Sequence, residues 1–139
     1  KKVAQVTSIG REKLKLPQAF EREAQIFETY TADFAKATEA VLRKYGKEII
    51  GKQFEMKRLA DISIDLFTGL SVLSRVSALI EAKGEAACKY EILIAHTFSQ
   101  QCKSRINSNI RKLAKNDDLS MIALADRMVE LERYPWDVI

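Results

Sequence analysis

The sequence of 139 residues is poor in glycine and proline, with 5 and 2 of them respectively. So few chain breakers exclude a collagen-like or low-complexity chain and favour long helices. The 2 cysteines are too few for a disulfide framework. No stretch approaches the roughly 18 apolar residues of a membrane-spanning helix. These shortages predict a globular, helix-rich chain with reduced, buried cysteines.

The sequence has 1 histidine, His96, which limits the chemistry available to it. Di-iron sites in helix bundles take their ligands from two Glu-x-x-His pairs. Position 93 is leucine here, so this class of metal centre is excluded on ligand count. We interpret His96 as a structural residue. No glycine-rich phosphate loop and no nucleophile elbow is present, and the residues by themselves indicate no catalytic, cofactor-binding or metal site.

The formal net charge of +4 is concentrated at the start of the chain. Residues 1–16 contain five basic residues and one acidic residue, whereas residues 17–139 contain equal numbers of each sign. A nucleic-acid-binding face needs its basic residues clustered on the folded surface. The remainder of the chain is neutral, so the charge does not support nucleic-acid binding.

Periodic apolar residues predict four helices, which span about residues 17–45, 52–83, 85–115 and 118–133. Short connections between them favour an all-α, antiparallel up-down-up-down four-helix bundle. The second helix is predicted to be the most buried, because Ile64 and Phe67 widen its apolar stripe. Gly69 in the middle of that helix indicates a close approach by a neighbouring helix.

The polar residues of the second helix form a pattern. Arg58, Asp61 and Asp65 lie on one face at i, i+3 and i+7, and Arg75 stands among apolar neighbours ten residues after Asp65. Two carboxylates four residues apart could form an acid–base site. However, Arg58 offers Asp61 an ion-pair partner, so the pattern favours structural charge pairing over catalysis.

The second helix also carries a family resemblance. The pattern Q-F…R-L-A-D…I-D-L-F…V-L-S-R-x-S occupies residues 53–77. This stretch resembles the extra C-terminal helical domain of acyl-CoA dehydrogenases of the very-long-chain type. The likeness extends over about residues 18–137, and the segment Tyr134-Pro135-Trp136 fits it more loosely.

The resemblance implies a parent enzyme rather than an active chain. Family members use FAD to oxidise acyl-CoA thioesters in fatty acid β-oxidation, with a glutamate base in the catalytic core. No catalytic or flavin-binding residue of that core can be placed on this sequence. We therefore expect the chain alone to be inactive and the FAD-dependent dehydrogenase to be its full-length parent.

By the same resemblance, residues 1–16 are expected to be a basic connector from an absent core, and residues 17–139 a C-terminal four-helix domain. The domain is expected to pack on the catalytic core of the same polypeptide and to shape an oligomer, a homodimer in the resembled enzymes. Polar docking candidates are Arg58, Asp61, Asp65 and Arg75.

The sequence leaves two points open, namely the location of the protein and an alternative function. The connector could make weak contact with a membrane, and the location would be cytoplasmic in a bacterium or mitochondrial and inner-membrane associated in a eukaryote. The alternative function is a free-standing helical adaptor that binds a protein partner. These hypotheses differ in whether a dehydrogenase core precedes the domain.

Overall fold

The structure is a computed structural model that describes residues 13–134. Its four α-helices are α1 (Glu21–Tyr45), α2 (Gln53–Lys83), α3 (Lys89–Ala114) and α4 (Asp118–Leu131), with short 3-10 turns at Gln18–Phe20, Gly46–Gly51 and Glu85–Cys88. The described residues contain no strand. Most of the predicted connector, including its proposed membrane contact, and Pro135 with Trp136 lie outside the described range. The all-α prediction and the positions of the four helices are confirmed.

Local sequence explains where the helices begin and end. Pro17 precedes the first turn, where its missing N–H costs no hydrogen bond. Gly46 follows α1 with φ +53°, and Gly84 follows α2 with φ +81°. These positive angles suit glycine, which has no Cβ to clash with the backbone. Each glycine therefore ends its helix and lets the chain reverse.

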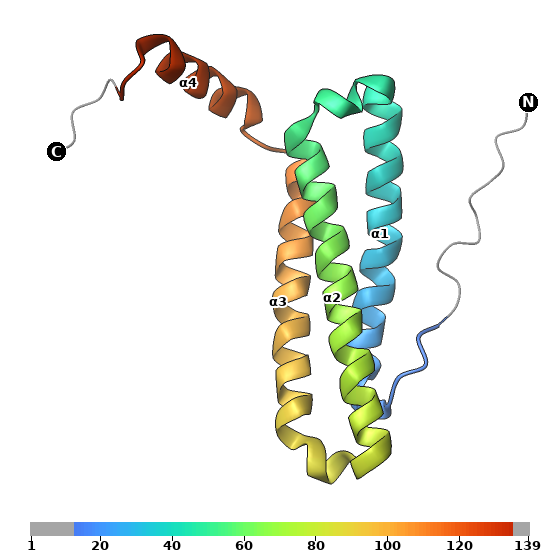
Figure 1. Ribbon diagram of the computed structural model, residues 1–139. Coiled ribbons are helices and arrows are strands. Elements are labelled where there is room, and N and C mark those ends of the chain that lie inside the picture. The colour runs from blue at the N-terminus through green and yellow to red at the C-terminus, as the bar shows by residue number, and fades with distance from the viewer. Residues whose placement is uncertain (1–12, 135–139) are drawn as a thin grey trace, which may run out of the picture.

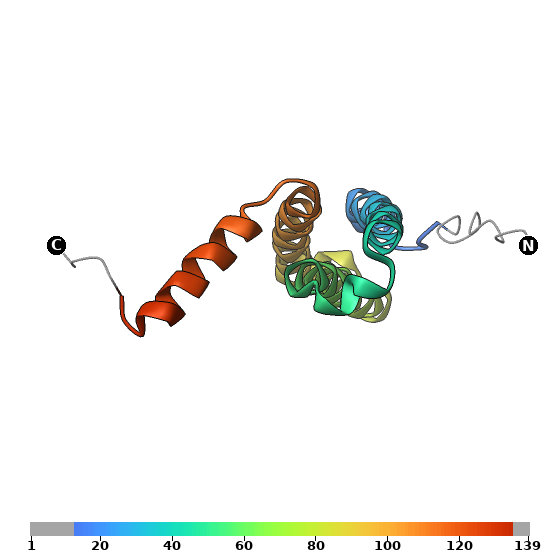
Figure 2. The ribbon, with the colours of Figure 1, turned by 90° about the horizontal axis from the view of Figure 1, so that it is seen from above.

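Helices α1, α2 and α3 lie side by side and run in alternating directions (Figure 1). The view along their axes shows them as a three-helix bundle (Figure 2). Its core is built from buried side chains of all three helices, namely Phe20 (in the turn before α1), Phe27, Ile62, Leu66, Leu73, Val76, Ala95, Cys102 and Ile106. Phe20, Phe27 and Val41, which are seven and fourteen residues apart, are all buried.

Helix α4 departs from the predicted arrangement. It projects away from the bundle instead of packing as a fourth antiparallel helix (Figures 1 and 2). All but the first and last of its residues are exposed. The predicted four-helix packing is therefore not confirmed.

Helix α2 is less buried than predicted, because two of its apolar residues point outward. Ile64 is 59% exposed and Phe67 is 72% exposed, whereas Ile62 and Leu66 lie in the core. Helix α2 carries apolar residues on both sides. By length and composition alone, it is long and apolar enough to cross a membrane. This corrects the expectation that no such stretch exists, although a helix with one face in a protein core passes the same test.

Candidate functional site

The start of α4 is tied to the start of α2 by one ion pair. Nη1 and Nη2 of Arg58 donate to the two carboxylate oxygens of Asp118 at 2.6 and 2.5 Å. Both side chains are largely shielded from water. This bidentate geometry restricts the relative orientation of the two side chains as well as their distance. The pair therefore fixes the first turn of α4 against the bundle.

Each side chain of this pair stabilises the charged form of the other. Hydrogen bonds from Arg58 lower the pKa of the Asp118 carboxyl below its ordinary value, although partial burial opposes that shift. A lowered folded-state pKa stabilises the fold above the unfolded pKa, about 4 for aspartate. That contribution is lost as the pH falls through the folded pKa. The tie between α2 and α4 thus holds at neutral pH.

The short connection between α3 and α4 is also constrained. Asn116 Nδ2 donates to the Lys112 carbonyl at 2.8 Å, and Asn116 Oδ1 accepts from the Asp118 N–H at 3.2 Å. One amide side chain thus satisfies a carbonyl at the end of α3 and an N–H at the start of α4. The connection is held at both ends and contributes to the direction of α4.

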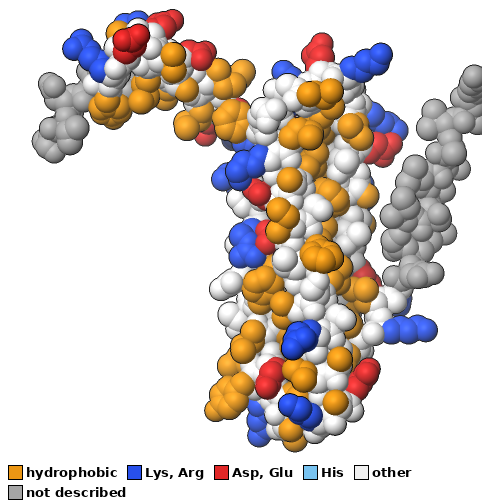
Figure 3. Space-filling model, viewed as in Figure 1, with side chains coloured by type: hydrophobic (Ala, Val, Ile, Leu, Met, Phe, Trp, Pro, Cys, Tyr) orange, Lys and Arg blue, Asp and Glu red, His pale blue; other side chains and the backbone are white. Residues whose placement is uncertain are grey.

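Beyond this anchor, α4 carries an uncovered apolar face. Large apolar residues recur along it at helical spacing, and all are exposed: Met121, Ile122, Leu124, Met128 and Val129. Hydrophobic side chains lie along the edge of α4 that faces its angle with the bundle (Figure 3). A helix of 14 residues is only marginally stable in water without tertiary packing. This face is therefore a candidate docking surface.

A second uncovered surface is the outer side of α2, defined here as Ile64, Phe67, Ser71, Ser74, Arg75 and Ala78. Arg75 is exposed, and no ion pair of it is found among residues 13–134. The residues around Phe67 and Arg75 border a shallow hollow of about 640 Å³. Figure 3 shows hydrophobic side chains along the face on which α2 lies. Small residues around an aromatic and an arginine suit close packing with a partner.

Grooves connect the two surfaces. One hollow, bordered by Ile64 and Arg105, lies between α2 and α3, and another lies where α4 leaves the bundle. Ser108 borders both, so the hollows adjoin. The second hollow is also lined by Arg111, Lys112 and Lys115. The described surface thus combines apolar residues with excess positive charge where α4 meets the bundle.

The remaining predicted polar residues pair differently from expectation. Asp61 bonds to Lys57 at 2.6 Å on the surface, not to Arg58. Asp65 is buried and accepts from Nε and Nη2 of Arg105 at 2.9 and 2.6 Å. The two carboxylates therefore serve separate ion pairs and form no shared acid–base site. The expected Arg58–Asp61 pair is wrong because Asp118, far away in sequence, holds Arg58.

Arg105 also lies beside a buried thiol. Its Nη2 is 3.4 Å from Cys102 Sγ. Burial raises the pKa of the Cys102 thiol, and the neighbouring Asp65 charge adds to that effect. A buried thiol with a raised pKa is a poor nucleophile. Cys88 is likewise buried and free, which agrees with the interpretation of both cysteines as core residues.

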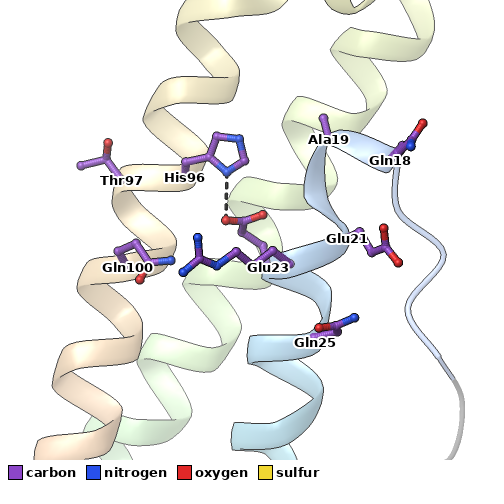
Figure 4. A pocket seen from close by; sticks show the side chains of 9 residues that line it. Gln18, Ala19, Glu21, Glu23, Gln25, His96, Thr97 and Gln100 are labelled. Atoms are coloured by element: carbon purple, nitrogen blue, oxygen red, sulfur yellow. Dashed lines mark ion pairs between the residues drawn. The ribbon is translucent and has the colours of Figure 1, made fainter.

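His96 is satisfied by a buried partner that the sequence reasoning missed. Its Nδ1 lies 2.9 Å from Oε1 of Glu23, whose side chain is 3% exposed. Figure 4 shows His96 of α3 pointing toward Glu23 of α1. Oε2 of Glu23 is buried without a hydrogen-bond partner, and the edge of the His96 ring packs on Phe20. The sequence signal for this buried partner was the position of Glu23, a carboxylate between the apolar residues Phe20 and Phe27.

We expect His96→Ala to destabilise the chain by about 1–3 kcal/mol, since Oε1 of Glu23 loses its partner at 2.9 Å. Adding Glu23→Met should recover part of that loss, because no buried charge then remains. Urea unfolding of the two variants and the parent chain measures this. Equal stability of His96→Ala and the parent would contradict the role assigned to the pair.

The described residues offer little for catalysis. No group of three or more potential metal ligands occurs among residues 13–134. The hollow at Glu23 and His96 is open and is lined by residues that include Gln18, Arg22 and Gln100. The uncovered apolar faces of α4 and α2 are therefore the candidate docking surface.

Comparison with known proteins places the chain. Residues 18–134 match the family described as ACAD9/ACADV, C-terminal domain. The chain is 32% identical over 96 residues to the mitochondrial very long-chain specific acyl-CoA dehydrogenase of Bos taurus, covering 69% of this chain and 14% of the relative. It is 35% identical over 83 residues to the enzyme of the same name from Rattus norvegicus, covering 60% and 12%. The matched region is thus a small part of each relative, and the chain belongs to the ACAD9/ACADV C-terminal domain family.

Proposed function

We propose that this chain is the non-catalytic C-terminal domain of an FAD-dependent acyl-CoA dehydrogenase, and that it packs on the catalytic core of the same polypeptide. The observation that carries this proposal is the uncovered outer side of α2, with Ile64 59% and Phe67 72% exposed. A domain free in water rarely keeps large apolar side chains exposed in a contiguous patch. The family match supports a core as the body that covers them.

The polar docking candidates divide into two groups under this proposal. Asp65 and Arg58 already have partners within the domain, so they hold its shape. Arg75 has an exposed guanidinium on the outer side of α2 and is free to bond a carboxylate or carbonyl of the core. Arg75 is thus the candidate for direct polar contact, whereas Asp61 lies in an exposed pair.

The remaining parts of the proposal concern the parent protein. The relatives are named as mitochondrial very long-chain specific acyl-CoA dehydrogenases. By that likeness, the parent oxidises long acyl-CoA thioesters, holds FAD in its core, forms a homodimer and lies in mitochondria if eukaryotic. We assign no chemical step to the described residues.

Deletion of residues 18–134 from the full-length parent tests the proposal. We expect the truncated enzyme to expose apolar surface to a hydrophobic dye and to change its number of subunits per particle in light scattering, because the core loses its cover. Phe67→Asp should weaken docking in the same direction, and Leu42→Asp, at an exposed apolar residue of α1, is the matched control. An unchanged number of subunits, dye binding and melting temperature after deletion would refute docking on the core.

A further inference from the structure

We propose that α4 forms one arm of an angled docking surface, and that the Arg58–Asp118 pair holds this arm so that the catalytic core fits between α4 and the bundle. This inference rests on the proposed function and adds to it the surface, its orientation and the chemistry of the partner. Its parts are the apolar face of α4, the hollow at the base of α4 and the outer side of α2.

The direction of α4 is set within the domain before any partner binds. Arg58 donates two hydrogen bonds of 2.5 and 2.6 Å to Asp118. Asn116 forms hydrogen bonds at both ends of the connection between α3 and α4. An unanchored helix would lose orientational freedom on docking, at a cost in binding free energy. A helix whose first turn is already held in place avoids part of that cost. The anchor is therefore a positioning device.

The surfaces on both sides of the angle are suited to a single large partner. Figure 3 shows hydrophobic side chains on the inner edge of α4 and along the α2 face in the same view. The hollow between them is bordered by Arg58 and Met121, which belong to α2 and α4. A body that fills the angle would cover Met121 and Ile64 at once. Such continuity favours one occupant over two separate ones.

The size of α4 favours an occupant on the same polypeptide. A helix of 14 residues is about 21 Å long, and one of its faces is well short of the roughly 800 Å² per partner of a stable interface between free proteins. A tethered partner is held at millimolar effective concentration, so a small face suffices. The relatives are about seven times longer than the matched part, which supplies such a partner.

The charged residues around the hollow at the base of α4 indicate the chemistry of the core surface that would dock there. Arg111, Lys112 and Lys115 line the hollow, and no ion pair of theirs is found among residues 13–134. Asp117 is the acidic residue there besides the paired Asp118. The core surface therefore presents apolar side chains bordered by carboxylates, since unpaired like charges would oppose docking.

Trypsin cleavage after Arg127, within α4, tests the inference in the full-length parent. The double variant Met121→Glu/Leu124→Glu places charge on the apolar face, and Ser120→Glu/Ala123→Glu places the same charge on the polar face. We expect the first to speed cleavage roughly tenfold or more, because an undocked helix opens readily, and the second to leave the rate unchanged. Because all four residues are exposed, neither variant should unfold the bundle.

The anchor is tested by charge reversal in the same assay. Arg58→Asp and Asp118→Arg alone should each speed cleavage, and the two together should restore slow cleavage. Equal rates for the apolar-face and polar-face variants would overturn the role of α4. If Phe67→Asp still weakens docking on the core in that case, the proposed function stands and only the role of α4 is wrong. Protection of α4 that rises with protein concentration would assign the face to a second copy and overturn the inference.

Discussion

Replacing Gly69 by alanine is expected to destabilise the chain by roughly 2–3 kcal/mol, although alanine is the better helix former. A Cβ at this position would overlap Cζ and Cε1 of the Phe27 ring. Phe27 is fully buried in the core, so the ring cannot move into solvent. The gain in helix propensity, about 1 kcal/mol, is smaller than the cost of repacking.

Thermal and urea unfolding measure this effect, with Gly51→Ala as the matched control. Nothing lies within 4 Å of a Cβ built at Gly51, so the control should change stability by less than about 0.5 kcal/mol. Adding Phe27→Leu to Gly69→Ala should cost less than the two single changes together, because the shorter side chain vacates the space. A Gly69→Ala chain as stable as the parent would show that α1 and α2 are not in this contact.

Removing Arg105 is expected to destabilise the chain by about 2–3 kcal/mol, more than removing its partner Asp65. The reason is a difference in burial. The Asp65 side chain is 10% exposed, whereas that of Arg105 is 47% exposed. Arg105→Ala leaves a buried carboxylate without its donor, whereas Asp65→Ala leaves a guanidinium that water can reach. We expect about 1–2 kcal/mol for Asp65→Ala.

A double-mutant cycle with urea unfolding separates the pair energy from other losses. Arg43→Ala is the control, since its ion pair with Glu39 is highly exposed on both sides and should contribute little. Equal losses for Arg105→Ala and Asp65→Ala would contradict the proposed asymmetry. A larger loss for Asp65→Ala would show that its carboxylate makes contacts beyond Arg105.

The helices could be predicted from sequence because their signals are local. Gly46 and Gly84 follow α1 and α2 with positive φ angles that glycine adopts without strain, and periodic apolar residues mark the helices between such ends. Gly69 was informative for the same reason, since an unfavourable residue in mid-helix indicated a close contact. Each of these inferences needs only one helix and its ends.

What sequence could not supply was the identity of partners. The partners of Arg58 and Asp65 lie sixty and forty residues away, so helix spacing alone could not find them. Ile64 and Phe67 have the same hydropathy whether they face a core or an interface, and the prediction of burial was wrong within this chain. The fourth helix shows the same ambiguity, because an amphipathic pattern indicates that a partner exists without saying where it is.

Hydrogen exchange of α4 amides tests the central claim most directly, in this chain and in the full-length parent. In the chain alone, α4 has an uncovered apolar face and should exchange almost as fast as an isolated helix. Docked on the core, its amides and those around Phe67 should exchange roughly a hundredfold more slowly, whereas exposed parts of α1 should not change. Equal exchange of both regions in the two proteins would contradict docking through these surfaces.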